Sequence, residues 1–364
     1  MEKLRFTIIG AGNGGQSIAG VLANKGYEVN LFDIDSAKIK AIKELGGIKF
    51  TGKIEGFGRP KEISNNIEET IKDVDVIIVV TTAAAYKDVA ENCAPHVQEG
   101  QLIVLMPGYL GGSIEFSRIL KQKGVECENL IISETESLIF SCRAKEVGYP
   151  RIHGIKDKLT LAAFPSKNTD KAVQKLKDVF PQLIPGENVL ETGFNNVNPM
   201  VHPPITIFNL GRVEQGEDWT FYPIGATPLI CKYIEKIDEE RIGVAKTLGV
   251  KAISTKEIIK KFYGVDKQSL YESIHGNQAY QVSKGPKTIH YRYFYEDVPM
   301  GLVPISSLGD MLQVDTPSIK ALIHVASILS GVDYWESGMT VERMGIKGKS
   351  VDAIKKMLSE GDVS

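Results

Sequence analysis

The sequence has few cysteines, and they lie far apart. The four cysteines (Cys93, Cys127, Cys142 and Cys231) form no Cys-x-x-Cys pair and no cluster with histidine at the spacing of metal ligands. This distribution argues against a disulfide framework, and we expect the protein to hold no metal. Free thiols are typical of a reducing compartment, so we expect a cytoplasmic protein.

An excess of charge of either sign is also lacking. Lysine and arginine number 43, aspartate and glutamate number 45, and the formal net charge is -2. Like charges form no long run, so we expect neither a nucleic-acid partner nor binding to an anionic membrane. A small anionic substrate remains compatible with this composition, because it needs only one or two well-placed cations.

Long apolar runs are missing as well. No stretch of about 18 consecutive apolar residues occurs, which argues against a membrane helix. A strand pattern begins already at Phe6, before a secretory signal could fit. We therefore expect no membrane partner and no export.

The length and composition predict two domains. The chain has 364 residues, of which 43% are hydrophobic and 24% charged, as in globular proteins. We predict that the first domain covers residues 1–185 and the second residues 186–364.

The first half alternates short apolar runs with amphipathic stretches. Apolar runs at residues 6–9, 28–33, 74–80, 102–106 and 130–133 are separated by segments with helical spacing. Strands this apolar, alternating with helices, indicate a parallel sheet covered on both faces. Residues 54–63 have the character of β-structure, and residues 181–186 are expected to be the connection between the domains.

A glycine-rich turn follows the first strand. Its G-x-G-x-x-G fingerprint comprises Gly10, Ala11, Gly12, Asn13, Gly14 and Gly15. In this pattern the first glycine allows the tight turn, the second lets the backbone approach a pyrophosphate, and the third permits close packing of helix on strand. The alternative is an ordinary turn. Because strand, glycine loop, helix and a second strand follow in order, we favour dinucleotide binding.

An acidic residue ends that second strand. Asp33 is placed to accept hydrogen bonds from the adenosine ribose, and its charge repels the 2′-phosphate of NADP. We therefore expect NAD as the cofactor. Lys38 lies nearby in the sequence, so NADP stays open as an alternative.

Three other segments fall where strands of the predicted sheet end. Thr81 begins a run of small residues, and Pro107 begins a loop rich in glycine, so both are candidates for cofactor contact. Thr135 lies in the acidic segment 134–137, which could bind a substrate carboxylate or a cofactor amide. Each segment is equally compatible with a plain turn, and the acids of the last could simply cap one.

The second half lacks strand-like alternation after Leu190. We therefore predict an α/β, doubly wound Rossmann-type NAD(P)-binding domain over residues 1–185, joined to an all-α C-terminal domain, the helical substrate domain, over residues 186–364.

The most informative stretch of the second half is residues 195–204. There His202 follows an asparagine-rich turn and is flanked by prolines. Such a segment is a poor helix or strand, so we expect a rigid loop that positions the histidine. Imidazole has the unperturbed pKa nearest to neutrality, which suits a general acid/base. A lone loop histidine is more often structural, however, and that alternative stays open here.

A second polar stretch, residues 290–304, combines aromatic residues with Arg292, Glu296 and Asp297. A carboxylate bonded to an imidazole fixes its tautomer, and an arginine can bind a substrate carboxylate with two hydrogen bonds. In an extended segment the two adjacent acids would point to opposite sides, and we favour Asp297 as the partner of the histidine. The alternative is an aromatic core segment with solvated charges.

These motifs together resemble the opine dehydrogenase family, of the octopine/nopaline type. The resemblance covers nearly the whole chain and rests on residues 10–15, 195–203, 292–303 and 334–345. It implies NAD(P)H-dependent reductive condensation of the amine of an L-amino acid with a 2-oxo acid, and the reverse reaction. By position it makes His202 the general acid/base and Asp297 its partner. Arg292 would then bind the carboxylate of the oxo acid or imine, and Thr135 would lie on the substrate side of the cofactor.

Two alternative functions are also compatible with a dinucleotide-binding sequence. One is a related dehydrogenase of a small hydroxy acid, of the ketopantoate reductase or glycerol-phosphate type, which would centre its chemistry on a lysine such as Lys232 or Lys246. The other is an NAD-sensing protein without turnover, which would not need the histidine and aspartate. We also expect a homodimer formed through the helical domain.

Overall fold

The structure is a computed structural model that describes residues 3–126 and 129–362. These residues form two compact units. The first contains residues 3–108, 112–189 and 359–362, and the second contains residues 109–111 and 190–358. The main division therefore falls between Val189 and Leu190, a few residues beyond the boundary drawn from the sequence. Cys127 lies outside the described residues, and Cys93 and Cys231 are free thiols.

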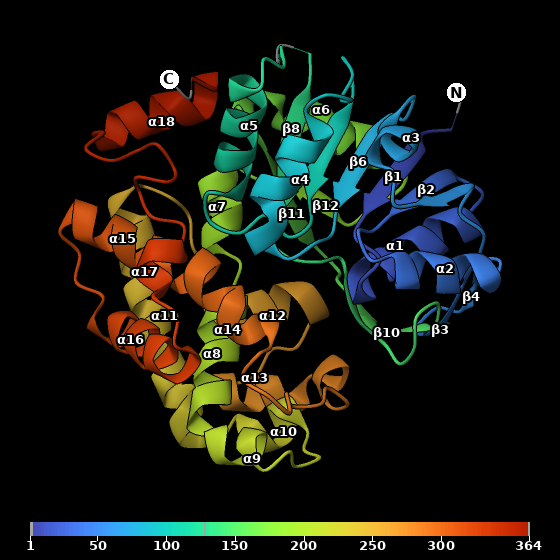
Figure 1. The fold of residues 1–364 in the computed structure, drawn as a ribbon. Coiled ribbons are helices and arrows are strands. Elements are labelled where there is room, and N and C mark those ends of the chain that lie inside the picture. Colours follow the sequence, from blue (N-terminus) through green and yellow to red (C-terminus); the bar gives the residue numbers. More distant parts are fainter. Residues whose placement is uncertain (1–2, 127–128, 363–364) are drawn as a thin grey trace. The chain divides into compact units, whose positions relative to one another are not determined.

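Eight strands form the main sheet of the first unit, in the order β12-β11-β8-β7-β6-β1-β2-β5 (Figure 1). All neighbouring strands are parallel except β8 and β11, which are antiparallel. The strand order reverses between β1 and β6, as in a doubly wound sheet. The strands are β1 (Arg5–Ile9), β2 (Glu28–Phe32), β5 (Glu62–Ser64), β6 (Val76–Val79), β7 (Leu102–Leu105), β8 (Ile131–Thr135), β11 (Leu159–Phe164) and β12 (Leu183–Pro185).

Helices connect these strands. They are α1 (Asn13–Asn24), α2 (Ser36–Glu44), α3 (Ile67–Ile71), α4 (Tyr86–Cys93), α5 (Gly112–Gln122) and α6 (Thr169–Leu176), with the short 3-10 turns η1 (Ala83–Ala85) and η2 (Ser166–Asn168). The central strands β6 and β7 are buried along their whole length, which explains why their sequences are continuously apolar. The predicted Rossmann-type sheet is confirmed.

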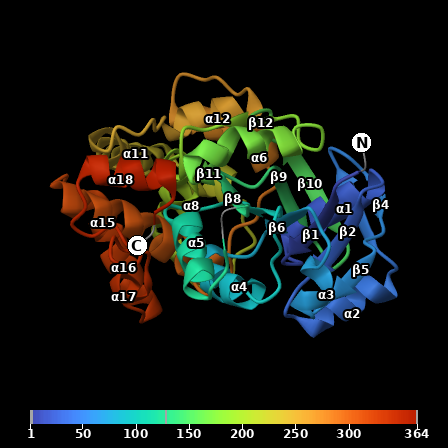
Figure 2. The same cartoon turned by 90° about the horizontal axis from the view of Figure 1, so that it is seen from above.

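A second, four-stranded sheet in this unit has the order β4-β3-β10-β9. Its strands are β3 (Ile48–Gly52), β4 (Gly56–Gly58), β9 (Phe140–Ala144) and β10 (Pro150–Ile155), and it packs on α1 (Figure 2). The helix approaches so closely that a Cβ on Gly58 would lie 2.0 Å from the carbonyl oxygen of Gly20. Of the segments in this second sheet, only residues 54–63 were predicted to have β-structure, because charged residues obscure the alternation over residues 140–155.

The expectation that residues 181–186 only connect the domains is wrong. Leu183–Pro185 forms β12, which pairs with β11 at the edge of the main sheet. A three-residue edge strand that contains a proline carries almost no periodic signal. For that reason it resembled a connection.

The second unit is helical. Its helices are α7 (Val189–Phe194), α8 (Asn198–Phe208), α9 (Leu210–Glu214), α10 (Phe221–Gly225), α11 (Pro228–Thr247), α12 (Thr255–Tyr263), α13 (Leu270–Gly276), α14 (Arg292–Tyr295), α15 (Val303–Leu312), α16 (Pro317–Ser330), α17 (Tyr334–Ser337) and α18 (Val351–Glu360). The 3-10 turn η3 (Gln278–Tyr280) and the π-helix η4 (Val298–Leu302) complete it. Beyond residue 190, β-pairing in the described chain is limited to one isolated bridge between Thr220 and Lys284.

Helices α8 and α11 lie side by side in this unit (Figure 1). The all-α character predicted for the C-terminal half is confirmed. None of the helices within residues 3–126 and 129–362 has the length and hydropathy that crossing a membrane requires.

Candidate active site

His202 lies in a helix, and the prediction of a rigid loop is wrong. It belongs to α8, with Pro199 in the first turn and Pro203 and Pro204 in the interior. A proline in the first turn removes no hydrogen bond, but each interior proline removes one at a cost of about 3 kcal/mol. Most of α8 is buried, and tertiary packing of this kind is the main source of helix stability in proteins. Burial therefore overrides the local sequence preference.

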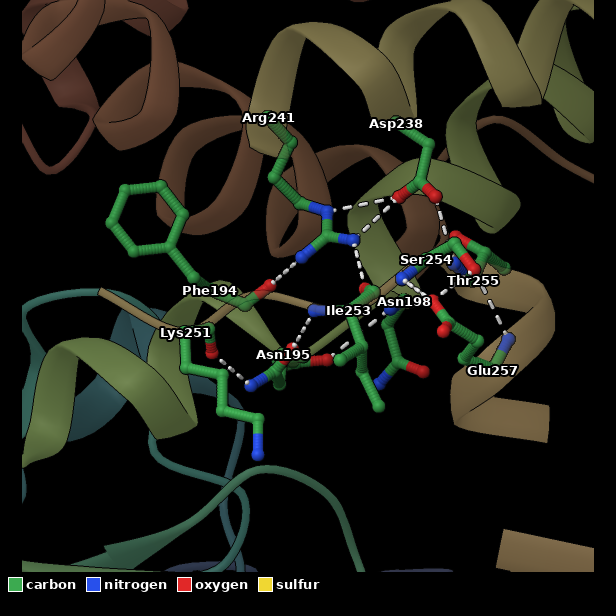
Figure 3. A network of polar contacts seen from close by, with 11 residues as sticks. Phe194, Asn195, Asn198, Asp238, Arg241, Lys251, Ile253, Ser254, Thr255 and Glu257 are labelled. Carbon is green, nitrogen blue, oxygen red and sulfur yellow. Dashed lines mark hydrogen bonds and ion pairs between the residues drawn. The ribbon is translucent and has the colours of Figure 1, made fainter. Parts of the chain in front are cut away.

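Polar contacts fix the turn that leads into α8 (Figure 3). The side chain of Asn195 donates to the carbonyl of Lys251 at 3.0 Å and accepts from the amide of Ile253 at 3.0 Å. The fully buried Arg241 donates to Asp238 and to the carbonyl oxygens of Phe194 and Ile253. The asparagine-rich turn is thereby tied to α11 and to the segment before α12.

The imidazole of His202 is enclosed on several sides. Its Nδ1 lies 2.8 Å from Oδ2 of Asp297, its Nε2 lies 3.3 Å from the hydroxyl of Tyr222, and its ring stacks on Tyr293 with centroids 4.1 Å apart. Only 4% of His202 and none of Asp297 is exposed. Because a carboxylate can only accept, Nδ1 carries the proton and Nε2 is left to accept one. The predicted pair is thus in contact, in a geometry that suits an oriented base.

The segment that carries Asp297 is not extended, contrary to the sequence interpretation. Arg292–Tyr295 forms α14, and Asp297 directly precedes the π-helix η4. Such π-turns are frequent at functional sites. A Cβ on Gly301 would lie 2.1 Å from a ring carbon of Pro199, so only glycine lets η4 approach α8 this closely. The two helices therefore bring the aspartate to the histidine, although 95 residues separate them.

Both acids of this segment are used. Glu296 is buried and accepts from Nη1 of Arg292 at 3.2 Å, while Asp297 accepts from the histidine. The Arg292 guanidinium also lies over the ring of Tyr293, 5.4 Å from its centroid. Its side chain is 39% exposed, so it can still offer donors to a ligand.

Burial sets the protonation state of these groups. Desolvation lowers the pKa of His202, and the nearby Arg292 lowers it further, while the charge and hydrogen bond of Asp297 act in the opposite direction. Burial likewise raises the pKa of the Tyr222 phenol well above its ordinary value, so this hydroxyl stays protonated. The lowered pKa of His202 thus favours the neutral form of its imidazole.

Two tyrosines of the site, Tyr109 and Tyr222, were not predicted from the sequence. Tyr109, from the loop after β7, donates to Oδ1 of Asp297 at 2.7 Å. Tyr222, from α10, covers Nε2 of His202 and stacks on Tyr280 with centroids 4.1 Å apart. No motif marks either residue. The only hint for Tyr109 was its place in the glycine-rich loop that begins at Pro107, and Tyr222 lies among other aromatic residues of the sequence.

In the first unit, the glycine loop has the geometry that dinucleotide binding requires. Gly10 has a φ of +105°, and a Cβ on Gly15 would lie 1.6 Å from the carbonyl oxygen of Gly10. A Cβ on Gly12 would meet nothing within 4 Å, and no side chain caps α1 at this residue. The loop therefore leaves backbone N–H groups at the start of α1 accessible to a phosphate.

The other predicted cofactor residues in this unit have defined contacts. Asp33 accepts from the amide of Ala11 at 2.6 Å, and Lys38 lies 3.6 Å from it. The exposed Asn13 accepts from the amide of Ala144 at 2.9 Å. Thr81 lies against Gly10, and the carbonyl of Pro107 accepts from the hydroxyl of Tyr86. Asp33 therefore stabilises the glycine loop through its hydrogen bond with Ala11.

The acidic segment 134–137 has structural contacts. Glu134 accepts from the amide of Ser113 at the start of α5, and Glu136 accepts from the amide of Thr160 at 2.7 Å. Thr135 is fully buried, and its hydroxyl donates to the carbonyl of Ser137 at 2.8 Å. The two acids therefore have structural contacts, and the substrate-side role of Thr135 stays a prediction.

No cluster of three or more potential metal-ligating side chains occurs among the described residues. Lys232 and Lys246, the lysines considered for a hydroxy-acid dehydrogenase, are exposed on α11. Neither has a described contact with the histidine and aspartate.

Comparison with known proteins decides the family. Residues 185–330 match the model of the NAD/NADP octopine/nopaline dehydrogenase alpha-helical domain, and residues 5–130 match that of the NAD-dependent glycerol-3-phosphate dehydrogenase N-terminus. An opine dehydrogenase of Arthrobacter sp. (strain 1C) is 37% identical over 356 residues, covering 98% of this chain and 99% of the relative. The chain belongs to the opine dehydrogenase family.

Other relatives and solved structures agree with this assignment. Octopine dehydrogenase of Pecten maximus is 26% identical over 380 residues, covering 92% of each chain. A structure of octopine dehydrogenase in complex with NADH and agmatine has a TM-score of 0.78 at 23% identity, covering 99% of this chain and 98% of the other. A ketopantoate reductase from Ralstonia eutropha JMP134, with a TM-score of 0.60 at 15% identity, shares the fold over 90% of this chain and 99% of its own.

Membership of the opine dehydrogenase family confirms the predicted enzyme class. The protein is an NAD(P)-dependent oxidoreductase that joins the amine of an amino acid to a 2-oxo acid by reductive condensation. The hydroxy-acid dehydrogenase and the sensor without turnover are therefore set aside.

Proposed function

We propose that His202 is the general acid/base of this reaction and that Asp297 orients it. The observation that supports the proposal is the 2.8 Å contact between Nδ1 and the wholly buried carboxylate. This contact leaves Nε2 as the only imidazole nitrogen able to exchange a proton with a substrate. Asp297 also stabilises the imidazolium that forms when Nε2 takes a proton.

The chemistry needs such a group at one defined point. The amine adds to the oxo acid to give a carbinolamine, whose hydroxyl must receive a proton before it leaves as water and the imine forms. In the condensing direction Nε2 of His202 first takes the proton that the ammonium group of the amino acid must lose to attack, and then gives that proton to the carbinolamine hydroxyl as it leaves; the reverse reaction runs these two transfers backwards. The bound dinucleotide supplies the hydride that reduces the imine.

Tyr222 and Arg292 complete the proposed substrate site. The Tyr222 hydroxyl lies at Nε2, where the substrate must also approach. The two therefore compete for the same position next to the imidazole. Arg292 would bind the carboxylate of the oxo acid with the donors that Glu296 does not use. Two anionic carboxylates bound beside His202 would raise the pKa of its imidazole, which prepares it to act as an acid.

The glycine loop is the proposed site of the dinucleotide. Gly12 leaves room for the pyrophosphate at the start of α1, and Gly10, Ala11, Asn13, Gly14 and Gly15 shape the turn around it. Thr81 and Pro107 follow strands whose carboxyl ends lie at the same sheet edge as the loop. We propose NAD over NADP, because a 2′-phosphate beside Asp33 would be repelled, although Lys38 partly offsets that charge.

The decisive experiment measures NADH oxidation with a matrix of amino acids and 2-oxo acids, in the wild type and in Asp297→Asn. We expect oxidation that requires both substrates, and a loss of about 10²-fold or more in the variant, because the amide cannot stabilise the imidazolium. Oxidation that never requires the amine would sink the proposed reaction. Full activity in Asp297→Asn would sink the proposed pair.

We also propose a cytoplasmic homodimer. Cys93 and Cys231 are free thiols, which suits a reducing compartment. Val325 and Ile328 of α16 expose apolar surface on one side of the helix, and Val332 follows just beyond its end. Ile328→Glu should shift the mass measured by light scattering from dimer to monomer, whereas Leu229→Glu, at another exposed apolar residue, should not. A wild-type monomer would end this proposal.

A further inference from the structure

Asp297 accepts two hydrogen bonds, one on each oxygen. Oδ2 faces the imidazole at 2.8 Å, and Oδ1 accepts from the hydroxyl of Tyr109 at 2.7 Å. Tyr109 is 1% exposed, and burial raises the pKa of its phenol well above the ordinary value. The hydroxyl therefore stays protonated and remains a donor to the carboxylate.

The backbone of Tyr109 is strained. Its φ is +60°, in the left-handed region that costs a residue with a side chain about 1–2 kcal/mol. Neighbouring contacts within the second unit hold the segment in place. A Cβ on Gly193 would lie 2.8 Å from Leu110, and one on Gly111 would lie 2.9 Å from Met344. An aromatic residue kept in this conformation while bonded to a buried carboxylate points to a functional role.

We propose that Tyr109 is a positioning residue that holds the Asp297 carboxylate and limits how strongly the His202–Asp297 pair binds a proton. Its hydrogen bond draws negative charge toward Oδ1 and away from the imidazole. The bond also prevents the carboxylate from rotating, so Oδ2 stays aligned with Nδ1. This inference rests on the acid/base role proposed for His202.

The other groups around the pair do not duplicate this contact. Arg292 acts on it through space, Glu296 is bonded to that arginine, and Tyr222 and Tyr293 lie against the imidazole. Helix α11 packs on α8, and its buried charged residues bind backbone groups away from the pair. Asp238 accepts from the amide of Thr255, and Glu240 accepts from the amides of Ser318 and Ile319. Arg241 donates to the carbonyls of Phe194 and Ile253. Lys320 of α16, which also packs on α8, pairs with Asp310. Among the described residues, Tyr109 is thus the neutral group that donates a hydrogen bond to the Asp297 carboxylate.

The test is the pH profile of kcat/KM in Tyr109→Phe. Removing the donor makes the carboxylate more basic, so the limb that reports protonation of the pair should move to higher pH by about half a unit to one unit. The rate should fall by about tenfold, less than the loss of a general acid/base. Tyr233→Phe is the control, because Tyr233 donates to the carbonyl of Ser318 in the same unit and does not touch the pair.

Replacing Tyr109 by 3-fluorotyrosine provides a second measurement that keeps the side chain in place. The fluorinated phenol is a stronger donor, so the same limb should move to lower pH. Limbs that coincide with the wild type in both proteins would overturn the proposal, whatever their rates. If Tyr109→Phe does not fold, the fluorinated protein alone decides. Activity retained in a His202 variant would instead refute the acid/base role itself.

Discussion

The two units place their functional groups in different ways. In the first, residues 10–15 make the glycine loop, and the main requirement is space that only glycine leaves. In the second, four segments that include Tyr109, His202, Tyr222 and Asp297 meet around one imidazole. The first site is local in sequence and the second is assembled by packing. Substitutions should therefore affect the two units in different ways.

The largest expected effect separates chemistry from cofactor binding. His202→Asn should lower kcat/KM by about 10²- to 10⁴-fold, because it removes the proposed proton-transfer group. The dissociation constant for NADH should stay near that of the wild type, since the glycine loop lies in the other unit. Steady-state kinetics and a fluorescence titration measure the two effects.

His275→Asn is the matched control, because His275 is a partly buried histidine of the same unit that bonds to the carbonyl of Ala226. Its activity should match the wild type. An equal loss in both variants would show that the histidine at α8 has no special role.

A pair of glycine substitutions tests the other side of the comparison. Gly15→Ala should lower the free energy of unfolding by about 3 kcal/mol or more, because its Cβ would collide with the carbonyl of Gly10. Gly12→Ala should change stability by less than about 0.5 kcal/mol. It should nonetheless weaken NADH binding by about tenfold, since the methyl group would occupy the phosphate approach. Urea denaturation and the binding titration distinguish them, and equal effects on stability would contradict the assignment.

Arg292 tests whether the assembled site binds the oxo acid. Arg292→Lys should raise the KM for the oxo acid by about 10-fold to 100-fold, because an ammonium group cannot form the paired hydrogen bonds of a guanidinium. The effect on kcat should be smaller. Arg212→Lys, at an exposed arginine that pairs with Glu217 in the same unit, should leave both constants unchanged. A change confined to the KM for the dinucleotide would refute the proposed role.

The smallest effect concerns pH and stability. The folded-state pKa of His202 is lowered, mainly by burial, so the neutral ring is favoured in the native protein. This contribution is fully present above the unfolded pKa of about 6.5 and is lost as the pH falls through the folded value. The stability difference between wild type and His202→Asn should therefore shift against the wild type from pH 7.5 to pH 5. A difference independent of pH would contradict the lowered pKa.

The same contrast explains what the sequence could predict. The glycine loop, the strand that ends near Asp33 and the apolar run of β6 are local signals, so the Rossmann-type sheet followed from them. The contact between His202 and Asp297 was expected from a family resemblance. The helix around His202 was missed, because the prolines disfavour it locally and burial against neighbouring elements, η4 and α11 among them, stabilises it. Tyr109 and Tyr222 depend on tertiary packing alone, which no spacing records.

Arg241 links His202, the proposed proton-transfer group, to the thermal behaviour of the protein. Its guanidinium binds the carbonyl at the end of α7 and the carbonyl of Ile253, directly beside the turn that leads into α8. Local unfolding of α8, the helix that carries His202, would consequently require the core of the same unit to open. On heating, loss of activity should coincide with cooperative melting, with no temperature range in which the protein is folded but its histidine is disordered.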